Sequence, residues 1–182
     1  MGKNILVITG SPRKGGNSDL LAEAFARGAS VKGHTVAIFN ALKNMGGCKA
    51  CDTCWSKGRA CTFTDAFTDL EPLLEQADTV VFATPVYWFS FSAQIKAAID
   101  RMYAYVSPNT LRPLTIKESA LLACAGDTDT HVFDGLVLTY EIMLRYMQWH
   151  NAGILTVPAV MDKGDILKTD ALEKAEAFGM RF

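Results

Sequence analysis

The stretch NILVITGSPRKGGNS, residues 4–18, decides the fold of this chain. Its apolar run from Ile5 to Ile8 predicts a buried parallel strand, which breaks at Gly10. A loop of small polar residues then leads into an apolar-periodic segment from Leu20, as expected for a helix. Such strand–loop–helix units hold phosphate groups, because backbone N–H groups at a helix N-terminus lack partners and the helix dipole is positive there.

The residues of this loop suit a phosphate ligand. Hydroxyl and amide side chains can donate to phosphate oxygens, an arginine can neutralise charge at the rim, and a glycine lets the backbone come close. The predicted phosphate residues are Ser11, Arg13, Gly16, Asn17 and Ser18. The spacing matches neither G-x-G-x-x-G nor G-x-x-x-x-G-K-[ST], and an ordinary turn between a strand and a helix is the alternative.

Composition and length narrow the function classes. The 182 residues suffice for one domain, predicted to span 1–182, and 49% are hydrophobic and 20% charged. A formal net charge of −1 argues against a nucleic-acid partner or a polybasic membrane surface. No apolar run is long enough for a membrane span. Five cysteines without an export signal indicate reduced thiols or ligands, so the predicted location is cytoplasmic.

Strand-like and helix-like segments alternate along the whole chain. Short apolar runs predict strands at Ile5–Thr9, Thr35–Phe39, Thr79–Ala83, Ala120–Ala125 and Ile154–Val157. Apolar residues recur at helical spacing in four segments, which predicts helices from Leu20 onward, around Ile95, over 133–147 and from Asp170 onward. This pattern predicts an α/β fold with a doubly wound, five-stranded parallel sheet. The flavodoxin-like strand order 2-1-3-4-5 is favoured over the Rossmann-like order, because G-x-G-x-x-G is missing.

The segment that follows the third predicted strand is unusually aromatic. It reads TPVYWFSFS over residues 84–92, and Pro85 ends the strand because proline cannot donate to a sheet ladder. In the flavodoxin-like order a ligand lies past the carboxyl ends of strands 1 and 3. Aromatic side chains there pack well against a flat flavin ring. The alternative is that Tyr87, Trp88 and Phe89 are core or subunit-contact residues.

Two loops in this order, with a cysteine cluster between them, resemble a known family. The motifs GSPRKGGNS at 10–18 and TPVYWFSFSAQIKAAIDR at 84–101 are similar to those of the NADPH-dependent FMN reductase and iron–sulfur flavoprotein family, from Lys3 to about Val160. The resemblance implies non-covalent FMN, with its phosphate in the first loop and NAD(P)H as co-substrate. It places the flavin ring against Pro85, Val86, Tyr87, Trp88 and Phe89, and a third contact loop at Ala125, Gly126 and Asp127.

The cysteine cluster forms an insertion after the second predicted strand. Cys48, Cys51, Cys54 and Cys61 give the spacing C-x2-C-x2-C-x6-C, which resembles the compact motif that holds a [4Fe–4S] cluster in iron–sulfur flavoproteins. Free or disulfide-capable thiols and structural zinc remain alternatives. After the last cysteine the family often has an acidic pair and a methionine, of which only Asp65 remains here.

These observations predict an FMN-dependent oxidoreductase of the NAD(P)H:flavin or quinone reductase type. Its electron donor would be NAD(P)H or a ferredoxin. An iron–sulfur flavoprotein, a non-enzymatic flavin electron carrier and a thiol redox sensor are the alternatives. No catalytic acid or base is predicted, because the flavin itself accepts the hydride.

The chain is also predicted to form a homodimer or homotetramer. In a helix predicted from Asp134 to Trp149, the residues Ile142, Tyr146 and Trp149 lie outside the buried stripe and would leave apolar groups in water. The alternative is that the segment 171–182 covers them within one chain.

Overall fold

The computed structural model describes residues 2–42 and 44–182. Its strands form one five-stranded parallel sheet in the order β2-β1-β3-β4-β5, which confirms the predicted flavodoxin-like arrangement. The strands are β1 (Asn4–Thr9), β2 (Thr35–Asn40), β3 (Thr79–Pro85), β4 (Glu118–Cys124) and β5 (His150–Val157). The longer helices are α1 (Asn17–Val31), α2 (Phe67–Gln76), α3 (Ala93–Arg101), α4 (Asp134–Met147) and α5 (Ala171–Gly179). Short 3-10 helices are η1 (Met102–Tyr105), η2 (Thr130–Phe133) and η3 (Asp165–Lys168).

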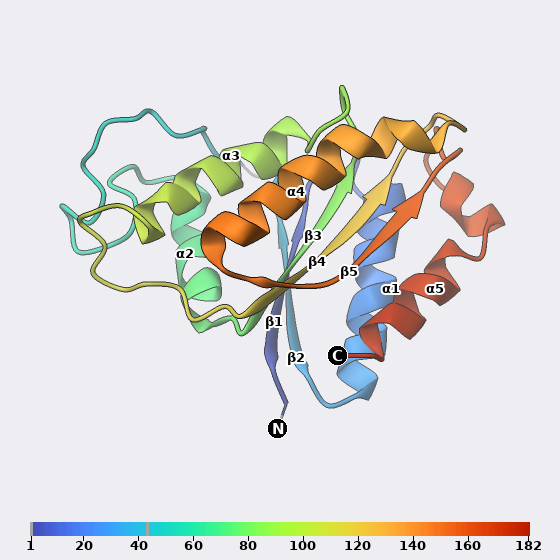
Figure 1. Ribbon diagram of the computed structural model, residues 1–182, viewed down its shortest axis with the longest axis horizontal. Helices are drawn as coiled ribbons and strands as arrows, with labels where there is room; N and C mark the ends of the chain where they lie inside the picture. The colour runs from blue at the N-terminus through green and yellow to red at the C-terminus, as the bar shows by residue number, and fades with distance from the viewer. Residues whose placement is uncertain (1, 43) are drawn as a thin grey trace.

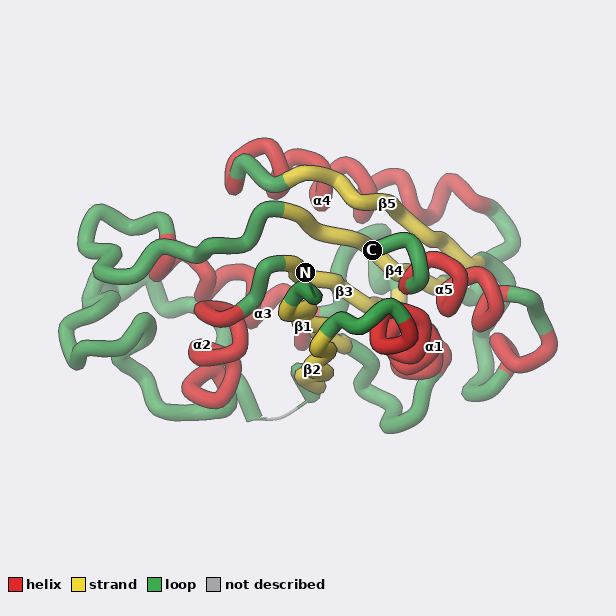
Figure 2. Tube along the Cα trace, turned by 90° about the horizontal axis from the view of Figure 1, so that it is seen from below, coloured by secondary structure: helices red, strands yellow, loops and turns green. Residues whose placement is uncertain are grey.

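The three central strands, β1, β3 and β4, are buried on both faces, as their near-continuous apolar runs predict, whereas the edge strands β2 and β5 are partly exposed. Successive side chains of a strand point to opposite faces, so Leu6 and Ile8 of β1 pack on one side while Ile5 and Val7 pack on the other. Helices α2, α3 and α4 cover the first face, and α1 and α5 cover the second (Figures 1 and 2). The crossovers therefore use both faces, as a doubly wound fold requires.

One helix was not predicted, and several predicted boundaries differ from the structure. Helix α2 was not predicted, because Pro72 interrupts its pattern and proline normally ends a helix. Strand β5 begins at His150 rather than at Ile154. Helix α4 ends at Met147, and Gln148 adopts a left-handed φ of 58°, which turns the chain back.

This turn decides where Trp149 lies. Its backbone N–H donates to the Leu144 carbonyl at 2.9 Å, and the residue is buried at 7% exposure. The prediction that Trp149 would be an exposed apolar group was therefore wrong. Ile142 and Tyr146 are exposed as predicted, at 50% and 70%. Segment 171–182 does not cover them, because α5 packs on the opposite face of the sheet (Figure 2).

Helices α1 and α5 lie in close contact through two glycines. A Cβ atom on Gly28 would collide with the backbone carbonyl of Glu176, and one on Gly179 would collide with that of Phe25. The small residues let Phe25 and Phe178 meet edge to face, with ring centroids 5.6 Å apart.

Among the described helices, none combines the length and apolar character that crossing a bilayer requires.

We expect Gly28→Ala to destabilise the fold by about 1–3 kcal/mol, because the added methyl group must push apart two helix backbones. This loss exceeds the gain of about 1 kcal/mol that alanine brings in helix propensity. Thermal or urea unfolding measures the change. Ser30→Ala, on the exposed face of the same helix, is the control and should stay within about 0.5 kcal/mol of the original chain. Equal stability of the two variants would contradict the close-packing argument.

Candidate functional site

A cavity of about 260 Å³ opens at the carboxyl ends of β1, β3 and β4, and we call it the switch-point cavity. It is lined by three loops that are far apart in the sequence and by a fourth that follows β5. The lining residues are Ser11, Arg13, Gly16, Asn17, Ser18, Pro85, Val86, Tyr87, Cys124, Ala125, Gly126, Val160, Met161 and Lys163. The reversal of strand order between β1 and β3 is where doubly wound sheets bind ligands.

A second, shallower hollow adjoins this cavity, and we call it the aromatic shelf. The two share Val86, Tyr87, Ala125 and Gly126, so they form one continuous depression. The shelf is lined by Val86, Tyr87, Trp88, Phe89, Ala125, Gly126, Asp127 and Val132. Every residue that the sequence predicted for the cofactor lines one hollow or the other.

The loop after β1 is shaped by its own hydrogen bonds. The Ser11 hydroxyl donates to the Arg13 carbonyl at 2.8 Å and accepts from the Arg13 N–H at 3.1 Å. Gly16 donates to the same carbonyl at 2.8 Å, and a Cβ there would collide with the Ser11 hydroxyl. A side chain at position 16 would therefore displace the Ser11 hydroxyl from this arrangement.

The start of α1 presents unsatisfied donors to the cavity. The first hydrogen bond of the helix runs from the Leu20 N–H to the Gly16 carbonyl, at 3.0 Å. The N–H groups of Asn17, Ser18 and Asp19 come before it and therefore have no acceptor within the helix. The Ser18 hydroxyl is buried and has no hydrogen-bond partner among the described residues. A buried polar atom costs free energy unless a ligand satisfies it, so this end of the cavity fits a phosphate.

The side chain of Asn17 serves the loop after β5 rather than the cavity. Its amide nitrogen donates to the carbonyls of Val160 and Asp162 at 3.1 and 2.9 Å, and its oxygen accepts from the Gly164 N–H at 3.0 Å. This clamp brings Met161 and Lys163 to the cavity rim. Sequence reasoning missed both residues, because only the folded sheet places a loop near position 160 beside residue 13.

A buried carboxylate lies beneath the same loop. Asp19 accepts a hydrogen bond from the Gly15 N–H at 3.0 Å, and burial raises the pKa of this carboxyl, although Lys163 opposes that shift. An anionic ligand beside Asp19 needs cations to offset the repulsion. Arg13 and Lys163 at the rim are placed to supply them.

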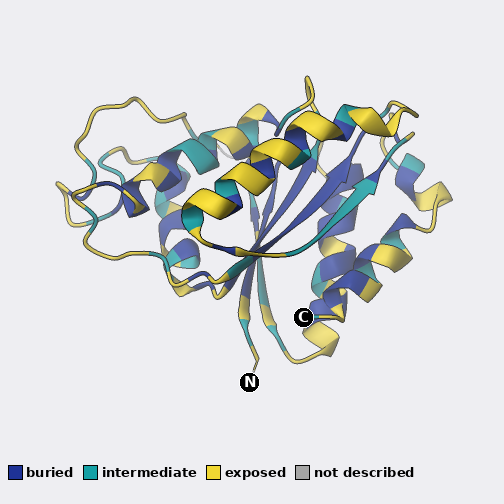
Figure 3. Ribbon diagram, viewed as in Figure 1, coloured by how far each residue is buried: buried dark blue, intermediate teal, exposed yellow. Residues whose placement is uncertain are grey.

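The aromatic shelf carries a tight, strained turn. Tyr87 and Ser90 exchange two backbone hydrogen bonds of 3.1 Å, and between them Trp88 and Phe89 both take left-handed φ angles, 48° and 62°. Bulky residues rarely adopt this conformation. The turn projects into solvent between β3 and α3 (Figure 3), and Trp88 is 92% exposed. These aromatic side chains are therefore not core residues, which removes one of the two alternatives for the loop.

The insertion after β2 encloses a separate cavity of about 270 Å³, which we call the cysteine cavity. Cys48, Cys51, Cys54 and Cys61 all line it as free thiols. Burial raises the pKa of the Cys54 thiol, with smaller contributions from the other three. The Thr53 hydroxyl, 3.0 Å from the Cys51 sulfur, lowers the pKa of that thiol.

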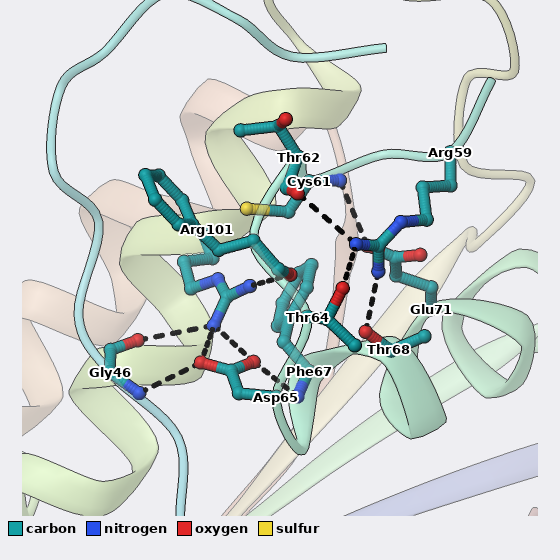
Figure 4. A network of polar contacts seen from close by, with 11 residues as sticks. Gly46, Arg59, Cys61, Thr62, Thr64, Asp65, Phe67, Thr68, Glu71 and Arg101 are labelled. Carbon is teal, nitrogen blue, oxygen red and sulfur yellow. Dashed lines mark hydrogen bonds and ion pairs between the residues drawn. The ribbon is translucent and has the colours of Figure 1, made fainter. Parts of the chain in front are cut away.

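Several contacts anchor the insertion to the helices behind it. Trp55 is buried, and its ring N–H donates to the Ala104 carbonyl at 2.8 Å. The Cys61 N–H donates to the Glu71 carboxylate at 2.8 Å, and burial raises the pKa of that carboxyl. Arg59 ties the segment to the start of α2 by donating to Thr62, Thr64 and Thr68 (Figure 4).

The central anchor is an ion pair between Arg101 and Asp65. One guanidinium nitrogen lies 2.6 Å from both carboxylate oxygens, and Asp65 also accepts from the Gly46 N–H at 3.1 Å (Figure 4). Burial alone would raise the pKa of Asp65, but these hydrogen bonds hold it below its ordinary value. Burial likewise opposes the charge of Arg101, yet contacts with Asp65 and Cys61 raise its pKa. Asp65, the one residue that matches the family's pattern after the last cysteine, thus links the two ends of the cysteine loop.

The four thiols share a cavity without closing on a single point. Within residues 2–42 and 44–182, no three cysteine, histidine or acidic side chains converge as the ligands of one metal ion do. The cysteine cavity also shares no lining residue with the switch-point cavity or the aromatic shelf. The metal-ligand role of the cysteines stays a prediction.

Comparisons with known proteins identify the family and the fold of the chain. The chain is 37% identical over 106 residues to an iron–sulfur flavoprotein of Archaeoglobus fulgidus, which covers 58% of this chain and 48% of that protein. It spans about half the length of several curated relatives that it matches. Among solved structures, an NAD(P)H:quinone oxidoreductase from Methanothermobacter marburgensis superposes with a TM-score of 0.78 at 17% identity, over 100% of this chain and 96% of that one.

A further solved structure is an FMN-dependent NADH-azoreductase from Bacillus anthracis in complex with FMN, with a TM-score of 0.67 and 16% identity over 100% and 99% of the two chains. At such identities these structures establish the shared fold alone. The family model for NADPH-dependent FMN reductase matches residues 3–158, which is most of the chain. The chain therefore belongs to the NADPH-dependent FMN reductase family.

Proposed function

We propose that this protein is a flavin-dependent oxidoreductase that holds FMN in the switch-point cavity and on the aromatic shelf. It passes electrons from NAD(P)H to a small acceptor such as a quinone or a free flavin. The convergence of the loops after β1, β3 and β4 on one continuous depression carries this proposal. Membership of the family supports it independently.

The residues of the switch-point cavity bind the FMN phosphate. The Ser18 hydroxyl and the first N–H groups of α1 donate to its oxygens, while Arg13 and Lys163 offset the charge of Asp19. Asn17 contributes its backbone N–H, because its side chain is committed to the loop after β5.

The aromatic shelf orients the flavin ring. Backbone N–H groups of the strained turn would donate to the ring's polar edge, and Tyr87, Trp88 and Phe89 would pack beside its apolar part. Bound FMN supplies the redox chemistry, since it accepts a hydride and returns electrons. The chain then has to position the ring and limit its contact with water, which requires no acid or base among its side chains.

We expect Arg13→Ala to weaken FMN binding about tenfold, because a charge-assisted hydrogen bond at an exposed rim is lost, worth about 1.5 kcal/mol. Flavin fluorescence titration of the apoprotein measures the dissociation constant. Riboflavin, which lacks the phosphate, should bind the original chain and the variant equally. Lys14→Ala is the matched control, because this exposed neighbour lines neither hollow. An original chain that binds riboflavin as tightly as FMN would refute the phosphate assignment.

A second candidate function is that of an iron–sulfur flavoprotein with a [4Fe–4S] cluster in the cysteine cavity. The observation in its favour is that all four predicted cysteines line one anchored cavity as free thiols. A cluster spaces its four thiolates more widely than a single ion does, so an open cavity suits it better than zinc. Ferredoxin would then be an electron donor, and the cytoplasm, where thiols stay reduced, is the proposed location.

We expect Cys51→Ala to lose iron while it retains FMN, because the two sites share no lining residue. Iron, sulfide and flavin analysis after anaerobic purification measures both. Cys124→Ala is the control and should retain iron, since this thiol is buried in β4 and burial raises its pKa to about 12. Absence of iron from the original chain would favour the simple reductase or a thiol redox sensor. Full iron content in Cys51→Ala would exclude Cys51 as a ligand.

The chain also presents an apolar helix face that suits a second copy. On α4 the residues Leu138, Ile142 and Tyr146 are 56%, 50% and 70% exposed, and their spacing of four residues places them in a row along the helix. Aromatic and aliphatic surface of this extent is typical of interfaces. We include a homodimer or homotetramer in the proposed function for this reason.

We expect the original chain to sediment and scatter light as a dimer or tetramer at micromolar concentration with FMN bound. The double variant Ile142→Glu and Tyr146→Glu should be monomeric, because two buried, unpaired charges would oppose the interface. Glu141→Gln, an exposed polar position on the same helix, is the control and should keep the oligomer. A monomeric original chain would contradict the proposal.

A further inference from the structure

Arg101 is a buried cation whose side chain points into the cysteine cavity. It is the last residue of α3, only 4% exposed, and it lines the cavity together with the four cysteines. Its guanidinium lies over the ring of Phe67 at 4.4 Å, which fixes its plane. A buried arginine has to direct each of its N–H groups to an acceptor, because leaving one unpaired costs about 1–3 kcal/mol.

The terminal nitrogens of Arg101 have their acceptors. One donates to both oxygens of Asp65 and to the Gly46 carbonyl, and the other donates to the Phe63 carbonyl at 3.2 Å. These partners lie just before Cys48 and just after Cys61, so Arg101 is hydrogen-bonded to both ends of the cysteine segment. The remaining donor, Nε, is buried and has no hydrogen-bond partner in the described part of the chain.

The sulfur of Cys61 is the group placed to accept from Nε. Figure 4 shows this sulfur beside the Arg101 guanidinium, on the side away from Asp65. The Cys61 backbone is held in place by its hydrogen bond to Glu71. A neutral thiol is a weak acceptor, whereas a thiolate, free or bound to a metal, is a strong one. The unpaired Nε beside this sulfur therefore suits a metal-bound cysteine at position 61.

We propose that Nε of Arg101 donates a hydrogen bond to the metal-bound sulfur of Cys61 and thereby raises the reduction potential of the group that the cysteines hold. This role rests on the second candidate function, because it needs a thiolate-ligated metal. Hydrogen bonds to ligand sulfurs favour the reduced, more negative state of such a group. Asp65 already cancels the formal charge of Arg101, so the directed N–H bond, rather than net charge, carries the effect.

The first experiment compares reduction potentials of anaerobically prepared holoprotein by spectroelectrochemical titration. Both Arg101→Lys and Arg101→Gln should have a more negative cluster potential than the original chain. Lysine keeps the charge beside Asp65 but has no donor at the Nε position. Arg59→Lys is the matched control, because Arg59 anchors the same loop through Thr62, Thr64 and Thr68. It should leave the potential unchanged.

Two results of this titration would overturn the proposal. One is an unchanged potential in both Arg101 variants that retain iron. The other is an equal shift in Arg59→Lys, which would mean that loosening of the loop, and not the hydrogen bond, moves the potential. FMN content of each variant shows that its fold is intact, because the flavin residues lie in separate cavities.

A second experiment separates this proposal from the iron–sulfur function. Cobalt(II) added to the reduced apoprotein forms thiolate bonds with a sulfur-to-metal charge-transfer band. A hydrogen bond withdraws charge from sulfur, so the band should move to longer wavelength in Arg101→Gln and Arg101→Lys and stay in place in Arg59→Lys. If the original chain holds no iron but the band moves as expected, the cluster is refuted and the role of Arg101 stands. No thiolate band with cobalt, or no shift in the Arg101 variants, refutes that role.

Discussion

The reversal of strand order between β1 and β3 is the constraint on which the rest of this structure depends. The chain leaves β1 toward one face of the sheet, through α1, and leaves β3 toward the other face, through α3 (Figure 2). Their loops therefore separate at the carboxyl edge, and the gap between them becomes the switch-point cavity. On the second face, α1 packs closely against α5 through Gly28 and Gly179.

The sequence allowed the fold, and the edge of the sheet at which the loops after β1, β3 and β4 meet, to be predicted because local patterns determine both. Buried parallel strands are short apolar runs, and their order follows from the alternation with helices and from the type of phosphate loop. The residues after each strand then fall at the same edge of the sheet without further information. Helix α2 escaped prediction because Pro72 contradicts the local pattern, and burial of Phe67, Leu70 and Leu74 overrides that contradiction.

Contacts between residues that are far apart in the sequence could not be predicted from the sequence. Lys163 reaches the cavity because the side chain of Asn17 clamps the loop after β5, and no motif in that loop indicates such a role. Trp149 is buried because one left-handed residue, Gln148, turns it beneath α4. Asp65 is the sole match to the family's pattern after the last cysteine. Its role as the ion-pair partner of Arg101 depends on α3, which places the two residues side by side.

Helix α3 connects the two candidate redox sites mechanically. Its N-cap, Ser92, accepts from the Ile95 N–H and directly follows the aromatic turn, while Arg101 at its other end grips the cysteine loop. Nine residues of α-helix span about 13 Å, so this one element sets the distance between shelf and cysteine cavity. The cavities share no side chain, and α3 packs on the sheet through Ile95 and Ala98. A displacement of the aromatic turn that reached the cysteines through α3 would thus have to move a helix that the core holds in place.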